Sequence, residues 1–254
     1  MSKVFPSRVS VMGVPIDPFT MDETVKKVCE FIDQRIFAHV IGVNADKYLQ
    51  MCDSDEMDEI VRACELINAD GASMLLAAKK LGVEIPERVA GIDLMYELCA
   101  VSAERGYKVF LLGATQQVVE MTREELTERY PGIRIVGMRD GYFNDGQFEE
   151  VALELSISQA DIVFVGITSP KKERLIESFR EKGLRGVFVG VGGSFDVISG
   201  NIPRAPKWMQ RANMEWIFRL IQEPRRLFLR YVVGNTRFIV CVGREMKRQR
   251  AGVR

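Results

Sequence analysis

The sequence predicts an α/β fold: a Rossmann-like, mostly parallel sheet with helices on both faces, followed by a helical, basic C-terminal appendage. Short apolar runs alternate with amphipathic stretches of helical length through most of the 254 residues, and such alternation is typical of parallel sheets. Past Gly193 the pattern changes, because the next segment holds both tryptophans and three prolines but no further strand pattern. We therefore expect an α/β core over residues 1–194 and an appendage over residues 195–254.

The apolar runs are the expected strands, and several end in Gly, Asn or Asp, which suit the turn from a buried strand into a loop. They cover residues 8–16, 38–44, 64–70, 107–114, 133–140, 160–167 and 186–193. The expected helices cover residues 20–35, 46–63, 71–82, 91–105, 115–130, 146–158 and 169–182. Strands joined through helices run parallel, with both faces of the sheet covered. In the appendage we expect short amphipathic helices, broken near Pro203, Pro206 and Pro224.

Ligands of such sheets bind beyond the carboxyl ends of the strands. This rule selects the residues at the expected strand ends, which are Asn44, Asp70, Gly113, Asp140, Gly166 and Gly192. Gly113 lies in the turn LLGATQQ, and Gly192 and Gly193 lie in VGVGGS. Backbone N–H groups of such turns can hold phosphate, although glycines that only permit tight turns explain them as well. Neither turn completes a dinucleotide fingerprint or a P-loop, so those two enzyme classes have little support.

The charge of the chain is unevenly distributed. Its formal net charge is zero, yet residues 201–254 carry 13 Lys/Arg against three Glu, so the rest of the chain is acidic by the same amount. The five cysteines have no metal-ligand spacing and suit reduced thiols in the cytoplasm. We expect no secretory signal, and no uncharged apolar stretch reaches the roughly 18 residues that span a bilayer. A basic tail predicts an anionic partner.

Asp70 and Asn44 are the two polar residues at strand ends that are the strongest candidates for a functional role. Asp70 lies in INADGASMLL, between a short apolar strand and a helix, where it can cap the helix or act as a general base. Asn44, in GVNADKYLQ, is either a turn residue or an amide that binds a polar ligand. Both readings stay open for each residue.

Several charged side chains also lie near the expected strand ends. Arg88, in ERVAGIDLM, precedes a helix and is either solvated or placed to neutralise phosphate or a carboxylate. In SPKKE, Lys171 or Lys172 can meet an anion at a helix start, or both can be solvated. His39 lies within an apolar strand and is expected to be structural. Because it is the single histidine of the chain, a Ser-His-Asp triad or a histidine-based metal site has little support.

Aromatic residues follow another strand end, in the segment RDGYF. It is either a plain turn or a loop that presents Tyr142 and Phe143 to a flat base.

Several longer motifs occur together in a characteristic order. They are NADG, ERVAGIDL, VFLLGA, GYF, SPKKE, VGVGGSFDVISGNIPRAPKWMQ and EWIFRLIQEPRRLFLRY. With them the chain resembles the WecG/TagA/CpsF family of bacterial glycosyltransferases, glycosyltransferase family 26, from about residue 9 to about residue 240. The last two segments are the most specific.

The resemblance implies transfer of a sugar from a UDP-sugar to a polyprenyl-diphosphate-linked saccharide in cell-surface polysaccharide biosynthesis. It further implies an inverting reaction without a metal or other cofactor, on a Rossmann-like fold whose appendage helps to close the site. Asp70 matches the proposed general base, Arg88 an arginine near the site, and Asn44 the Asn of a Thr-x-Asn motif. That motif lacks its threonine, because residue 42 is Gly, and the family's PKQE has Lys172 in place of Gln. These two departures leave the donor sugar open.

The resemblance also gives the basic appendage a double role. Arg219, Arg225, Arg226 and Arg230 are expected to meet the UDP or the lipid diphosphate, whereas Arg244 to Arg250 are expected to hold an anionic membrane surface. The protein would then lie peripherally on the cytoplasmic face of the bacterial membrane, without nucleic acid as a partner, and a homo-oligomer stays open. The alternatives are a soluble nucleotide-dependent oxidoreductase and a basic-tailed nucleic-acid-binding protein. The tail's bulky apolar residues at helical spacing favour an interfacial helix over the latter.

Overall fold

The expected α/β core is present in a computed structural model, which describes residues 5–211, 214–222 and 224–252, without the side chains of residues 211, 225–227 and 229–231. In these ranges, six strands form one fully parallel sheet in the order β4-β3-β8-β7-β5-β6. The strands are β3 Phe37–Val43, β4 Leu66–Ala69, β5 Lys108–Gly113, β6 Arg134–Arg139, β7 Ile162–Gly166 and β8 Gly186–Gly190. The predicted fold class is confirmed.

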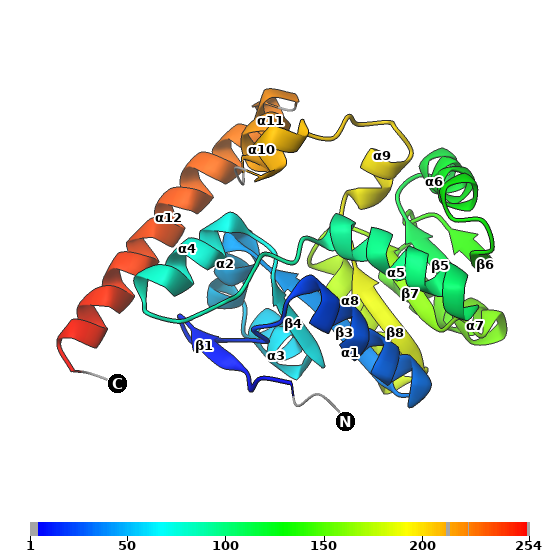
Figure 1. Cartoon of the computed structure of the whole chain (residues 1–254), viewed down its shortest axis with the longest axis horizontal. Helices are drawn as coiled ribbons and strands as arrows, with labels where there is room; N and C mark the ends of the chain where they lie inside the picture. The colour runs from blue at the N-terminus through cyan, green and yellow to red at the C-terminus, as the bar shows by residue number, and fades with distance from the viewer. Residues whose placement is uncertain (1–4, 212–213, 223, 253–254) are drawn as a thin grey trace.

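Helices cover both faces of the sheet (Figure 1). They are α1 Met21–Asp33, α2 Ala45–Asp53, α3 Asp55–Ala63, α4 Ala72–Lys80, α5 Gly91–Arg105, α6 Gln116–Arg129, α7 Phe148–Ser158, α8 Lys171–Glu181 and α9 Ser194–Ile198. Strand side chains alternate between two packing layers, as a pleated strand requires. In β5, Val109 and Leu111 pack with α1, α5 and α6, whereas Phe110 and Leu112 pack with α7 and α8. The near-continuous apolar runs of these strands follow from burial on both faces.

Two expected elements were wrong in detail. Residues 8–16 do not form one strand, because a tight turn at Met12 and Gly13, both with positive φ, folds them into an antiparallel hairpin of β1 Val9–Val11 and β2 Val14–Ile16. Residues 46–63 form two helices, because the extended backbone of Ser54 ends α2 and its side chain caps α3.

The hairpin protects one edge of the sheet. Just after β2, the N–H of Asp17 donates to the carbonyl of Ile67, and the Asp17 carboxylate accepts from the N–H of Ile67, both at 2.8 Å. Arg8 in turn donates to the same carboxylate at 2.9 Å. The outer edge of β4 is therefore paired at this point, and β4 is fixed in position.

The appendage consists of α10 Lys207–Arg211, α11 Glu215–Gln222 and α12 Pro224–Arg250, and it carries both tryptophans. The expectation of only short helices was wrong for the last one, since α12 runs unbroken over 27 residues. Pro224 is its first residue, where proline needs no hydrogen-bond partner and its fixed φ suits a helix. The prediction that the appendage begins at residue 195 is not tested, although Phe195 and Ile198 of α9 are buried in the core.

Helix α12 lies alongside α2 (Figure 1). Phe238 and Val242 are buried in the same apolar cluster as residues of α2 and α4. The ring of Phe238 meets that of Tyr48 edge-on at 5.5 Å, and Arg237 makes a two-pronged ion pair with Asp53 at 2.7 and 3.0 Å. The appendage is thus packed onto the core by its longest helix.

The ends of β5 and β7 approach so closely that Gly113 cannot carry a side chain without strain. Its φ is +137°, and a β-carbon there would lie 2.4 Å from the carbonyl oxygen of Gly166. We expect Gly113→Ala to lower the free energy of unfolding by about 2–5 kcal/mol, from backbone strain and overpacking together. Gly183→Ala is the control, because φ is +70° there with no atom within 4 Å, and strain alone costs about 1–2 kcal/mol. Urea denaturation compares the two, and equal losses would contradict the close approach.

His39 supplies a second prediction, because it is the single histidine of the chain and its side chain is fully buried in β3. Burial lowers its pKa to about 3, although the neighbouring Glu173 carboxylate opposes this. In the unfolded chain its pKa returns to about 6.5. The unfolded state therefore binds the proton first, and stability is lost as pH falls from about 6.5 towards 3.

We expect the free energy of unfolding to drop by about 1 kcal/mol from this residue between pH 7 and pH 5.5. His39→Leu should remove that part of the pH dependence, whatever its effect on absolute stability. Urea titrations at the two pH values measure it. An identical pH dependence in both proteins would show that His39 does not stay neutral in the folded state.

Candidate active site

Asp70 immediately follows β4 at the carboxyl edge of the sheet. Its N–H donates to the carbonyl of Val43 at 3.0 Å, which ties it to the end of β3. Beside it, the N–H of Val89 donates to the carbonyl of Ala69 at 3.0 Å. That bond places the segment before α5, including Arg88, next to Asp70.

Glycines at two strand ends make room for the predicted polar residues. A β-carbon on Gly42 would lie 2.7 Å from Cβ of Asp70, and one on Gly71 would lie 2.8 Å from Cβ of Asn44. Close-packed atoms cannot approach so far without moving. The glycine that replaces the threonine of the Thr-x-Asn pattern thus allows Asp70 to lie directly against β3. The Asn44 side chain accepts from the N–H of Lys47 at 3.0 Å and caps α2, as the turn reading predicts.

Asp70 is partly accessible but closely surrounded by protein. Burial raises the pKa of its carboxyl group, while the charges of Arg88 and Arg219, the N–H of Gly91 and the charge of Lys172 act in the opposite direction. Gly91 is the first residue of α5, so the helix start also favours the carboxylate. A carboxylate with a raised pKa is suited to taking up a proton near neutral pH.

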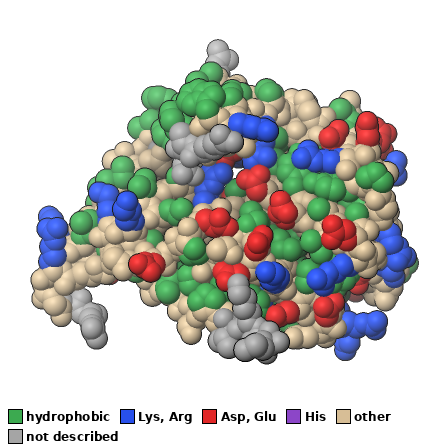
Figure 2. Space-filling view, in the orientation of Figure 1, with side chains coloured by type: hydrophobic (Ala, Val, Ile, Leu, Met, Phe, Trp, Pro, Cys, Tyr) green, Lys and Arg blue, Asp and Glu red, His purple; other side chains and the backbone are tan. Residues whose placement is uncertain are grey.

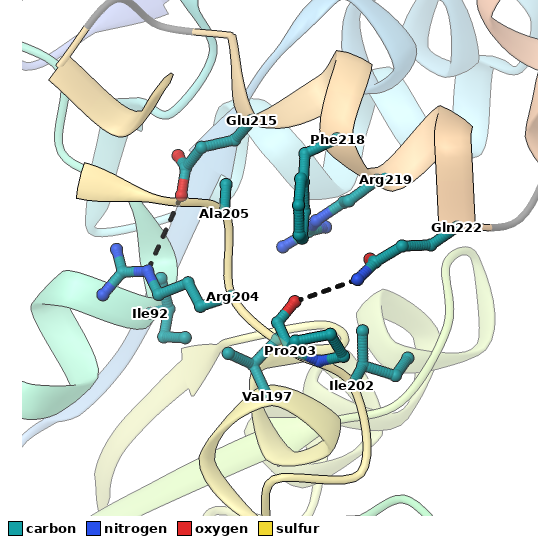
Figure 3. A pocket seen from close by; sticks show the side chains of 10 residues that line it. All are labelled: Ile92, Val197, Ile202, Pro203, Arg204, Ala205, Glu215, Phe218, Arg219 and Gln222. Carbon is teal, nitrogen blue, oxygen red and sulfur yellow. Dashed lines mark hydrogen bonds and ion pairs between the residues drawn. The ribbon is translucent and has the colours of Figure 1, made fainter. Parts of the chain in front are cut away.

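The appendage reaches this edge of the sheet through Glu215, the first residue of α11. Its carboxylate accepts from Nη2 of Arg88 at 2.7 Å and lies 3.6 Å from Nε of Arg204 (Figure 3). Arg204 also pairs with Asp93 of α5 at 2.5 Å. All four side chains are at least partly buried, so this cluster joins the appendage to the segment that carries Arg88.

A small pocket lies between α5, α9, the loop that follows α9, and α11 (Figure 3). Apolar groups of Ile92, Val197 and Phe218 form part of its wall, and Arg219 borders it. The amide of Gln222 donates to the carbonyl of Pro203 at 3.2 Å and holds the end of α11 to the loop. Arg219 is an exposed residue of α11 whose charge acts on Asp70.

The other predicted arginines of the appendage, Arg225, Arg226 and Arg230, have side chains outside the described residues. Their backbone belongs to the first turns of α12. Their role in binding an anion remains a prediction.

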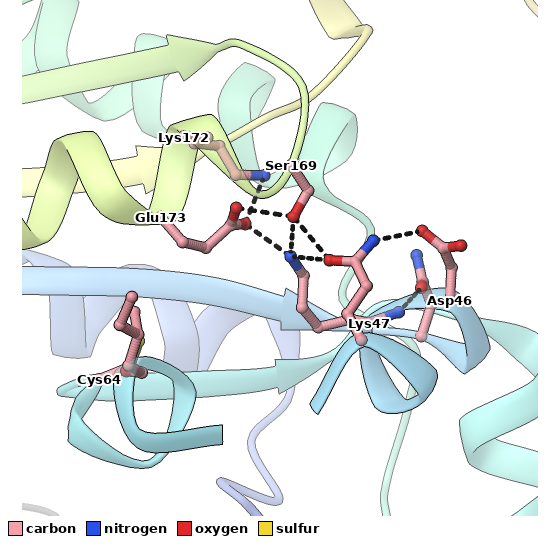
Figure 4. Close-up of polar contacts among 9 residues, drawn as sticks. Asp46, Lys47, Cys64, Ser169, Lys172 and Glu173 are labelled. Carbon is pink, nitrogen blue, oxygen red and sulfur yellow. Dashed lines mark hydrogen bonds and ion pairs between the residues drawn. The ribbon is translucent and has the colours of Figure 1, made fainter. Parts of the chain in front are cut away.

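A buried polar network joins the first turn of α2 to that of α8 (Figure 4). The ammonium of Lys47 lies 2.7 Å from Oε1 of Glu173, and it also donates to Ser169 and Gln50. Ser169 donates to Oε2 of Glu173 at 2.7 Å. Burial alone would raise the pKa of Glu173, but the ammoniums of Lys172 and Lys47 and these hydrogen bonds hold it at about 2. The glutamate is therefore ionised throughout the physiological range.

The loop after β6 places its two aromatic residues differently. Tyr142 is 78% exposed, whereas Phe143 is buried among apolar residues of α7 and α8. Lys171 lies 4.0 Å from the centre of the Phe143 ring and donates to the carbonyls of Gly141 and Phe143. The structure thus does not bring Phe143 to the surface beside Tyr142, and Lys171 fastens the loop.

The predicted glycines lie at the same edge as Asp70. Gly113 and Gly166 end β5 and β7, and Gly192 and Gly193 connect β8 to α9. Lys172 lies against Gly190 at the end of β8. Asp140 follows β6 and accepts from the N–H of Tyr142, so its carboxylate caps that turn.

Among the described residues, no group of three or more His, Cys, Asp or Glu side chains is arranged to hold a metal ion. The sequence reasoning missed Glu215, Arg204 and Lys47 as partners at this edge. Their contacts span 111 to 127 residues of sequence, and no local pattern indicates them. The specific segment EWIFRLIQEPRRLFLRY was the one available signal for Glu215.

Comparisons with known proteins identify the family of the chain. The family model for the glycosyl transferase WecG/TagA/CpsF family matches residues 9–252. The chain is 35% identical over 197 residues to an N-acetylglucosaminyldiphosphoundecaprenol N-acetyl-beta-D-mannosaminyltransferase of Bacillus subtilis, covering 77% of this chain and 76% of the relative. It is 31% identical over 224 residues to a protein of the same name from Bacillus spizizenii, covering 88% and 84%.

Proposed function

The chain belongs to the WecG/TagA/CpsF family of glycosyl transferases, and on that premise we propose that it transfers a sugar from a UDP-sugar to a polyprenyl-diphosphate-linked saccharide. The names of both relatives describe transfer of an N-acetylhexosamine to a saccharide on undecaprenyl diphosphate. The proposed place of the reaction is cell-surface polysaccharide biosynthesis. The family assignment removes the support for the oxidoreductase and the nucleic-acid-binding alternatives.

The observation that carries the proposal is the environment of Asp70. Its carboxylate lies at the carboxyl edge of the sheet, with a pKa raised by burial and with the charges of Arg88 and Arg219 acting on it. In the proposed step, Asp70 takes the proton of an acceptor hydroxyl as that oxygen bonds to the anomeric carbon. The bond from this carbon to the diphosphate breaks, and UDP leaves with the electron pair from the opposite face. The configuration at the anomeric carbon is thereby inverted.

The leaving diphosphate needs positive charge and hydrogen-bond donors. Arg88 and Arg219 are the described arginines placed to supply them, and Arg225, Arg226 and Arg230 remain expected members of the set. This assignment gives the charge stabilisation to side chains, so the proposed reaction needs neither a metal nor a cofactor. Because Arg219 comes from α11, the appendage completes the site.

We also propose that the appendage binds an anionic membrane surface. No helix within the described ranges has the length and apolar content needed to cross a bilayer. Large apolar side chains nevertheless face outward from the appendage, at Trp208, Trp216, Ile221, Phe228, Val232, Val233, Ile239 and Val240. Figure 2 shows green apolar side chains over this part of the molecule and blue Lys and Arg side chains nearby. Such a surface suits a helix that lies in the headgroup region, on the cytoplasmic face where the acceptor lipid would be reached.

Asp70→Asn tests the chemistry. The amide keeps the shape of the side chain but cannot take the proton, so we expect sugar transfer to fall by roughly 10²–10⁴-fold. Binding of UDP should persist, because the arginines remain. A radiolabelled UDP-N-acetylhexosamine with a short-chain lipid diphosphate acceptor provides the assay, and thermal unfolding checks the fold. Turnover within tenfold of the wild type would contradict the assignment of Asp70 as the general base.

Replacing Arg244, Lys247, Arg248 and Arg250 with Gln tests the membrane proposal. Each basic residue contributes about 1 kcal/mol near an anionic surface, so partition onto phosphatidylglycerol vesicles should fall by at least tenfold, measured by co-sedimentation at low salt. The matched control replaces Lys26, Arg123, Lys182 and Arg185, which are exposed on the core. An equal loss in both variants would mean that only net charge, and not the appendage, matters.

A further inference from the structure

Lys172 is a charged residue that the fold buries at the carboxyl edge of the sheet. It is the second residue of α8 and is 9% exposed. Burying an ammonium group is costly unless an anion accompanies it. Its partners therefore indicate what the site is built to hold.

Glu173 is the anion nearest to Lys172, but it is already engaged. Its Oε1 binds the ammonium of Lys47 at 2.7 Å, and its Oε2 accepts from Ser169. The ammonium of Lys172 lies 3.4 Å from the same Oε1 (Figure 4). This is longer than a normal hydrogen bond between an ammonium and a carboxylate.

The buried network thus holds two ammonium groups and one carboxylate. Within the part of the chain that the structure describes, no hydrogen bond is recorded for the ammonium of Lys172. One positive charge in the network therefore lacks an anion of its own. Lys47 makes the closer ion pair with Glu173, at 2.7 Å against 3.4 Å, so the surplus charge lies with Lys172.

The position of Lys172 relates this surplus charge to Asp70. A β-carbon on Gly190, the last residue of β8, would lie 3.0 Å from Cε and 3.1 Å from Nζ of Lys172. A β-carbon on Gly91 would lie 3.6 Å from the carbonyl oxygen of Gly190, and the N–H of Gly91 supports the carboxylate of Asp70. Lys172 and the start of α5 therefore both lie against Gly190, and the charge of Lys172 acts on the carboxyl group of Asp70.

We propose that Lys172 is a further anion-binding residue of this site, in addition to the arginines, and takes an anionic oxygen group of the donor substrate. The inference rests on the proposed function and specifies the substrate class further. Two groups share the required chemistry, namely the diphosphate of the donor and a carboxylate carried by the transferred sugar. Either would supply the closer anionic partner that the ammonium lacks, and the absence of a side chain on Gly190 leaves room for Lys172 at this edge of the sheet.

The test compares Lys172→Gln, which keeps a polar side chain of similar length, with Lys182→Gln, which removes an exposed charge at the other end of the same helix. Isothermal titration with UDP, UDP-glucose and UDP-glucuronate supplies the readout, because the last two differ only in a neutral or an ionised group on the sugar. A charge-assisted hydrogen bond corresponds to an affinity loss of about 10–100-fold. If the diphosphate is the ligand, Lys172→Gln loses this factor for all three probes. If the sugar carboxylate is the ligand, the loss is confined to UDP-glucuronate.

Affinities within twofold of the wild type for all three probes would overturn the proposal and leave the proposed function intact. If the wild type binds none of them, the UDP-sugar assignment fails together with the inference.

A stability measurement tests whether Lys172 has a purely structural role. Lys47→Gln should be strongly destabilising, because it removes the close partner of Glu173, whereas Lys172→Gln should lose much less. Equal losses in thermal unfolding would make Lys172 a structural partner of Glu173 and would also overturn the proposal.

Discussion

The structure depends on how closely the carboxyl ends of neighbouring strands approach one another. A β-carbon on Gly42 would collide with Asp70, one on Gly113 with the backbone of Gly166, and one on Gly166 with the ring of Phe195. One on Gly190 would press against the end of the Lys172 side chain. Because these positions carry only hydrogen, Asp70 and Lys172 can lie against strand backbone rather than above it. The glycines therefore work less as flexible turns than as gaps in the packing, and the polar groups of the site occupy those gaps.

Charge is distributed over this edge by segments that are far apart in the sequence. Glu215 of the appendage pairs with Arg88 of the core, and Lys47 after β3 pairs with Glu173 in α8. Each pair fixes a polar side chain by joining two elements, so the electrostatics of Asp70 depend on the docking of the appendage as well as on the sheet. The contact of α12 with α2 serves the same end, because it holds the appendage in place.

The sheet was predictable from sequence because buried parallel strands leave continuous apolar runs, and the strand-end rule located Asp70 and Asn44. The same reasoning failed where the decisive contact is local but not hydrophobic, as at Ser54, or where a tight turn interrupts an apolar run, as at Met12 and Gly13. It also grouped Phe143 with Tyr142, since the core that receives Phe143 is assembled from α7 and α8. The charge pairs of the site involve partners more than 100 residues away, and no spacing pattern encodes them.

The placement of the tryptophans has a practical consequence. The chain has two, Trp208 in α10 and Trp216 in α11, and they are 64% and 42% exposed. Intrinsic tryptophan emission therefore arises solely from the appendage, while far-ultraviolet circular dichroism is dominated by the helices of the core. The two signals together form a pair of native reporters, which distinguish detachment of the appendage from unfolding of the sheet without any label.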